Sequence, residues 1–101
     1  MKETKNKFPG QLHLEPYKGS EKSGVNAFEI GGDYIIVAFK DGRIYLYNHE
    51  FPGEEPVEIM KERARDGKRL SSYINRDIRQ YYVAQWDKNS KMFKPNKKIL
   101  A

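Results

Sequence analysis

Residues 25–48 contain three runs rich in β-branched and aromatic side chains, separated by short glycine-containing segments. The runs are VNAFEI, YIIVAF and RIYLYN, and the segments between them are GGD and KDG. Residues of these types favour strands, and short glycine-bearing segments join neighbouring strands into antiparallel hairpins. This pattern predicts a three-stranded antiparallel β-meander.

The turn between the second and third runs can close in two ways. Asp41 and Gly42 can form a two-residue type I′ turn, or Lys40 and Asp41 can form a type I turn followed by Gly42 as a left-handed bulge residue. We favour the bulged turn, which places Val37 opposite Tyr45. The two faces of the sheet then carry Ile35, Val37, Phe39, Tyr45 and Tyr47 on one side, and Ile36, Ala38, Ile44 and Leu46 on the other.

Both of these faces are apolar, whereas a sheet covered on one side alternates apolar with polar residues. We therefore expect the face of Ile36 and Leu46 to be covered as well. The candidates are the N-terminal arm through Leu12 and Leu14, the C-terminal tail through Met92 and Phe93, or a second copy of the chain. Tyr45 and Tyr47 are expected in the core, the alternative being a platform on which bases stack.

A helix is predicted within FPGEEPVEIMKERARDGK. Pro56 suits the first position of a helix, Gly67 suits its end, and the acidic residues precede the basic ones, as the helix dipole favours. Its buried stripe is expected to be Val57, Met60 and Ala64, which follow helical spacing.

A second helix is predicted from Ser71 or Ser72, either of which is a suitable N-cap. Apolar residues recur at helical spacing along it, and this face should lie against the sheet: Leu70, Ile74, Ile78 and Tyr81. The expected fold class is therefore α+β, a three-stranded antiparallel β-meander packed against two C-terminal helices, with an extended N-terminal arm.

The length of 101 residues corresponds to one domain. Residues 1–24, which mix charges with proline and glycine, are expected to form the extended arm, residues 25–86 the α+β domain, and residues 87–101 a basic tail. The chain has no cysteine and only two histidines, His13 and His49, so we expect no disulfide, no structural metal and no cofactor. No nucleophile–base pair or paired carboxylates can be named, so we do not expect an enzyme.

The charge is unevenly distributed along the chain. Residues 1–56 hold seven Lys and Arg against nine Asp and Glu, whereas residues 57–101 hold twelve against five. This asymmetry indicates an anionic partner for the C-terminal half, although lysine-rich surfaces also arise for solubility alone. No run approaches the ~20 apolar residues of a membrane span, and we expect a cytoplasmic protein that has no contact with a membrane.

The segments FKDGRIYLYN and LSSYINRDIRQYY, with a helix between them, resemble the KTSC domain over residues 25–82. This family occurs as a stand-alone bacterial protein and at the C-terminus of some lysyl-tRNA synthetases. Its motifs correspond here to Val37, Phe39, Gly42, Tyr45, Tyr47, Ser72, Tyr73, Asn75 and Arg79. Where family members place charged residues on outward strand positions, this chain has Ile36, Ala38 and Leu46. The resemblance implies an RNA-binding accessory module without an established activity of its own.

The start of the second predicted helix is the candidate binding site. Unpaired N–H groups at a helix N-terminus favour a phosphate, and Lys68, Arg69, Ser71 and Ser72 surround this end. Arg76 and Arg79 would extend the basic track, Tyr73 or Tyr82 would stack on bases, and Asn75 would contact the ligand or hold a turn. The partner would be RNA or another single-stranded nucleic acid.

Two other interpretations remain open at this point. The same serines, basic residues and tyrosines also occur at the rim of a core in proteins that bind no polyanion. Alternatively, the chain is a protein-interaction or homodimerisation module that uses the apolar face formed by Ile36, Ala38, Ile44 and Leu46.

Overall fold

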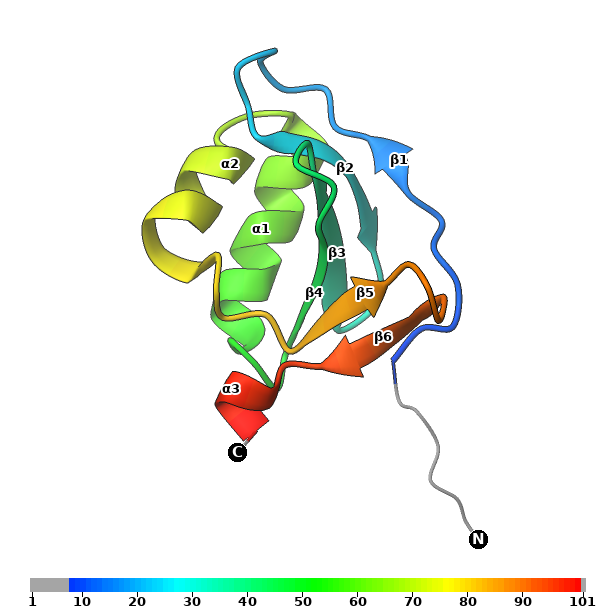
Figure 1. Ribbon diagram of the computed structural model, residues 1–101. Helices are drawn as coiled ribbons and strands as arrows, with labels where there is room; N and C mark the ends of the chain where they lie inside the picture. Colours follow the sequence, from blue (N-terminus) through cyan, green and yellow to red (C-terminus); the bar gives the residue numbers. More distant parts are fainter. Residues whose placement is uncertain (1–7, 101) are drawn as a thin grey trace, which may run out of the picture.

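The computed structural model describes residues 8–100, apart from the side chains of Asp77, Ile99 and Leu100. Its strands form one antiparallel sheet in the sequential order β1-β2-β3-β4-β5-β6, and α1 and α2 lie on one side of that sheet (Figure 1). The strands are β1 Glu15–Pro16, β2 Val25–Ile30, β3 Tyr34–Phe39, β4 Ile44–Asn48, β5 Ala84–Asp87 and β6 Met92–Pro95. The helices are α1 Glu54–Asp66, α2 Leu70–Tyr73, the π-helical turn η1 Ile74–Ile78 and α3 Lys97–Leu100.

The prediction of a three-stranded meander followed by two C-terminal helices was wrong. The sheet has six strands, and α1, α2 and η1 lie between β4 and β5 in the chain. The segment expected as a basic tail supplies β6 and α3, and the arm supplies the two-residue β1. These strands were missed because they are short and poor in β-branched residues. Strand β5 forms by pairing with the distant β4, as Leu46 pairs with Ala84, and β6 forms by pairing with its neighbour β5, as Trp86 pairs with Phe93.

The bulged register predicted for the β3–β4 hairpin is confirmed. Val37 lies opposite Tyr45 and Ile35 opposite Tyr47. Gly42 has φ 98°, a backbone conformation that residues with a Cβ atom rarely adopt. Tyr45 and Tyr47 are consequently core residues, with 5% and 0% of their surfaces exposed.

The first face of the sheet is covered by α1 and by the α2–η1 segment. Helix α1 buries Val57, Met60 and Ala64, as predicted, and it ends at Gly67, where φ is 69°. The α2–η1 segment buries Leu70, Ile74 and Ile78 in the same core. Tyr81 was also expected there, but η1 ends at Ile78, and Tyr81 is 51% exposed beside Phe51.

The second face of the sheet is covered by both segments that the sequence offered, the arm and the C-terminal strand. Ile36 and Leu46 are buried with Phe93 of β6, and Leu12 and Leu14 of the arm pack against this cluster. The ring of Phe8 contacts the ring of Phe93 edge-on, with centroids 6.5 Å apart, so the arm reaches β6 across the sheet (Figure 1). The apolar face on which the homodimer expectation depended is therefore covered by the chain itself.

Candidate nucleic-acid interface

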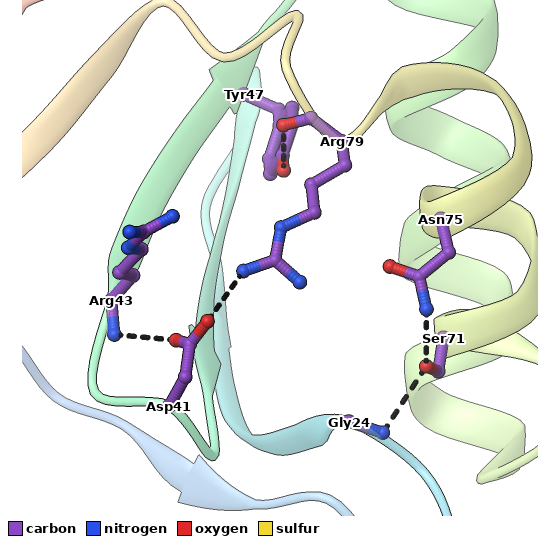
Figure 2. A network of polar contacts seen from close by, with 7 residues as sticks. All are labelled: Gly24, Asp41, Arg43, Tyr47, Ser71, Asn75 and Arg79. Atoms are coloured by element: carbon purple, nitrogen blue, oxygen red, sulfur yellow. Dashed lines mark hydrogen bonds and ion pairs between the residues drawn. The ribbon is translucent and has the colours of Figure 1, made fainter.

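The start of α2 differs from the capped helix that was expected. Arg69 is the N-cap, with φ 64°, and no side chain caps the helix. The hydroxyl of Ser71 instead accepts a hydrogen bond from the backbone N–H of Gly24 at 3.2 Å and one from Nδ2 of Asn75 at 3.3 Å (Figure 2). Ser71 and Asn75 thus tie α2 to the end of the N-terminal arm.

Lys68, Ser72 and Arg76 are exposed at this end of the molecule, as is Arg69. A hollow of about 280 Å³ lies beside them, lined by Tyr17, Ser20, Lys22, Ser23, Arg69, Ser71 and Ser72. The structure therefore brings Arg69, Ser71 and Ser72 together, and adds Lys22. Helix α2 has only four residues before the backbone widens into a π-helical turn, so its peptide dipoles contribute little to anion binding.

Arg79 is engaged within the protein. Its Nη2 lies 2.8 Å from Oδ2 of Asp41 (Figure 2). Its guanidinium also lies over the ring of Phe39, 4.2 Å from the centroid. The carbonyl of Arg79 also accepts a hydrogen bond from the hydroxyl of Tyr47 at 3.0 Å. These contacts join the end of η1 to the β3–β4 hairpin.

Asp41 is held as a carboxylate by its neighbours. The backbone N–H of Arg43 donates to Oδ1 at 3.0 Å, and this bond, followed by the one from the Arg79 side chain, lowers the pKa of Asp41. Since Arg79 is one of the cations that the sequence assigned to a ligand, its pairing with Asp41 leaves less positive charge at η1 than the sequence suggested.

The two tyrosines expected to stack on bases have different surroundings. Tyr73 packs against the core, and the guanidinium of Arg63 lies 5.1 Å from its ring centroid. The ring of Tyr82 is stacked on the ring of Tyr45, with centroids 3.9 Å apart and an angle of 12° between the planes. Of the predicted residues, Tyr82 alone lines the groove described next.

A groove of about 690 Å³ lies between the β3–β4 hairpin and the C-terminal hairpin and helix. Its charged lining consists of the cations Arg43, Lys88, Lys94, Lys97 and Lys98 and the acids Asp41 and Asp87. The two hairpins are close: a Cβ atom placed on Gly42 would lie 3.2 Å from Nζ of Lys88. Sequence reasoning missed this site, because it treated the lysines as a tail and assigned no role to Arg43.

Both acids of this groove already have cationic partners. Asp41 is paired with Arg79, and Oδ2 of Asp87 lies 2.9 Å from Nζ of Lys94. The hydrogen bond from Lys94, followed by one from the backbone N–H of Asn89, lowers the pKa of Asp87 to about 2. The four remaining lining cations have no carboxylate within ion-pair distance among the described residues: Arg43, Lys88, Lys97 and Lys98.

Among the side chains that the structure describes, no cluster of His, Asp and Glu is arranged to hold a metal ion. None of the helices described has the length and apolar character needed to cross a membrane.

Comparison with known proteins gives no relative from which a function can be transferred. No family model, curated protein or solved structure matches this chain significantly. The resemblance to the KTSC domain therefore stays a prediction.

Proposed function

We propose that this protein is a small accessory module that binds the phosphate backbone of a nucleic acid, with RNA as the first candidate. The binding site is the groove between the β3–β4 hairpin and the β5–β6 hairpin. The observation that carries the proposal is the convergence of Arg43, Lys88, Lys97 and Lys98 around a groove whose acids are already paired. Cations that neutralise phosphates release condensed counterions, which is the main source of affinity in such complexes. A cytoplasmic location accords with an RNA partner.

The position of these cations on ordered elements supports the groove over a flexible basic tail. Arg43 directly precedes β4, Lys88 follows β5, and Lys97 and Lys98 belong to α3. Asn96 secures α3 to the domain, because its Nδ2 donates to the carbonyl of Tyr82 at 3.0 Å and its Oδ1 accepts from the N–H of Lys98 at 3.1 Å. Cations carried by an ordered backbone lose less conformational entropy on binding than those of a flexible tail, because only their side chains have to be ordered.

The hollow at α2 extends the proposed path of the bound nucleic acid. The N–H of Lys40 donates to the carbonyl of Gly24 at 2.8 Å, so the segment that lines the hollow lies against the β3–β4 turn. Asp41 and Gly42 of the same turn line the groove. A nucleic-acid strand that leaves the groove over this turn would meet Lys22 and Arg69. Two further cations lie nearby, Lys68 just before α2 and Arg76 in η1.

The test compares two double variants that remove the same charge from different surfaces. Lys97→Gln/Lys98→Gln alters the groove, and Lys18→Gln/Arg65→Gln alters the hollow between β1 and the end of α1. Binding of a labelled single-stranded RNA is measured over a range of salt concentrations. The groove variant should bind more weakly and reduce the salt slope by about 1.4, at roughly 0.7 per phosphate contact on a single strand.

The control variant should keep the wild-type slope within error. Equal losses in the two variants would show that net charge alone attracts the RNA, and would refute a binding site in the groove. Absence of RNA binding by the wild-type protein at moderate salt would refute the proposed function itself.

A further inference from the structure

Tyr82 provides a rigid aromatic surface inside the groove. One face of its ring is covered by Tyr45, at a centroid distance of 3.9 Å, and the residue is half-buried while lining the groove. Tyr45 is itself fixed, since it is 5% exposed and contacts Phe39 edge-on at 5.4 Å. Among the described residues, no second ring is stacked on the face of Tyr82 that points away from Tyr45.

The backbone of Tyr82 is held as firmly as its ring. Its carbonyl accepts the hydrogen bond from Asn96, which is 7% exposed. The neighbouring Val83 donates its N–H to the carbonyl of Leu46 at 2.8 Å. A planar ring whose one face and backbone are both held in place needs no reordering to receive a second ring on its other face, and this makes stacking favourable.

Gln85 supplies a polar group in the same groove as Tyr82. It lies opposite Tyr45 in the β4–β5 ladder and lines the groove. Within the described part of the chain, its side-chain amide makes no hydrogen bond. The side-chain amide of Asn96, by contrast, both donates to backbone carbonyls and accepts from a backbone N–H. An amide carries both donors and an acceptor, so it is suited to the edge of a nucleobase.

We infer that the groove selects single-stranded nucleic acid by stacking one unpaired base on Tyr82, while the surrounding cations hold the flanking phosphates. This inference rests on the proposed function and specifies its ligand. A base within a duplex has both faces covered by its neighbours, whereas an unpaired base can be splayed out onto an aromatic side chain. The unpaired base would thus form the third ring of a stack with Tyr82 and Tyr45.

The first test uses the wild-type protein and needs no variant. It measures binding to a single-stranded RNA, to a strand of equal length and charge that lacks bases, and to the corresponding RNA duplex. The base-bearing strand should bind roughly 5- to 150-fold more tightly than the abasic strand, the range expected for one stacked base. A single-stranded DNA of the same sequence then shows whether the ribose hydroxyl contributes.

The second test compares Tyr82→Leu with Tyr82→Phe, using thermal unfolding to verify that both variants are folded. Tyr82→Leu should lose the preference for the base-bearing strand and retain the wild-type salt slope on the abasic strand. Tyr82→Phe should retain the preference, because its ring can still stack.

The outcomes separate this inference from the function on which it rests. If the abasic strand binds as tightly as the base-bearing one, with a salt slope that depends on Lys97 and Lys98, the groove function stands and base stacking is refuted. Retention of the preference by folded Tyr82→Leu likewise overturns the role of Tyr82. If none of the ligands binds, both proposals are refuted together.

Discussion

The guanidinium of Arg79 is bonded to the carboxylate of Asp41, with Nη2 2.8 Å from Oδ2, and this contact joins the π-helical turn η1 to the β3–β4 hairpin. The two residues lie 38 positions apart in the chain. Because the same guanidinium covers the ring of Phe39, Arg79 closes one end of the helix–sheet interface.

Replacement of Arg79 should therefore reduce stability. Arg79→Ala is expected to lower the free energy of unfolding by about 1 to 2 kcal/mol, through loss of the cation–π contact and of a partly exposed ion pair. Arg79→Lys keeps the charge but not the planar stacking group, so it should recover only part of this loss. Urea unfolding monitored by circular dichroism measures both, and an unchanged midpoint in Arg79→Ala would contradict a structural role.

Gly42 should resist substitution more than another turn glycine. Gly42→Ala forces a Cβ atom onto a residue with φ 98° and is expected to cost about 1 to 2 kcal/mol. Gly32→Ala is the matched control, since a Cβ atom there meets nothing within 4 Å and no positive φ is present. The control should stay within about 0.5 kcal/mol of wild type in the same unfolding experiment. Equal effects at the two positions would rule out backbone strain as the cause.

Asp87 should weaken the binding of nucleic acid in the groove, because its carboxylate forms an ion pair with Lys94. Asp87→Asn keeps an acceptor for the N–H groups of Asn89 and Ser90 and releases the lysine. The variant should bind single-stranded RNA more tightly than wild type, with a salt slope larger by about 0.7 for one additional phosphate contact. Glu62→Gln, on the exposed side of α1, is the control for net charge and should leave the slope unchanged. A slope in Asp87→Asn equal to that of the control would exclude a specific effect of Lys94.

The same carboxylate predicts how stability depends on pH. The pKa of Asp87 falls from its ordinary value of 3.8 to about 2 on folding, chiefly through the hydrogen bond from Lys94. In this range the unfolded state binds more protons, so the contribution is complete above about pH 4 and is lost as the pH falls through about 2. Asp41, whose pKa is also lowered, acts in the same direction. In Asp87→Asn, thermal unfolding should show a smaller loss of stability between pH 4 and pH 2 than in wild type.

Lys61 should be more important to the fold than its place in a charged helix suggests. It is 3% exposed, and its Nζ donates to the carbonyl of Gly32 at 2.9 Å and pairs with Glu58 at 2.8 Å. Lys61→Ala removes these bonds and the packing of the aliphatic stem, and is expected to cost about 2 kcal/mol. Lys61→Met keeps most of the packing and should cost about half as much. If the two variants are equally destabilised in urea, the hydrogen bonds carry the effect and the packing does not.

The sequence was sufficient to predict those elements whose turn residues and apolar spacing lie within a few residues of one another. Gly42 and the alternation around it favoured the β3–β4 register that the structure shows, because a type I turn followed by a left-handed bulge residue places Val37 opposite Tyr45. Gly67 and the spacing of Val57, Met60 and Ala64 likewise predicted the end and the buried stripe of α1.

Contacts between distant segments decided the rest of the fold and nearly all of the candidate site. β5 and β6 have weak strand signals of their own and exist because they pair with β4 and with each other, so the groove of Arg43, Lys97 and Lys98 could not be seen in the sequence. Arg79 was expected on a ligand and is instead bound to Asp41. The physical reason is the same in each case: a charge or a strand edge acquires its role from its neighbours in space, and the order of residues in the chain does not state which neighbours these are.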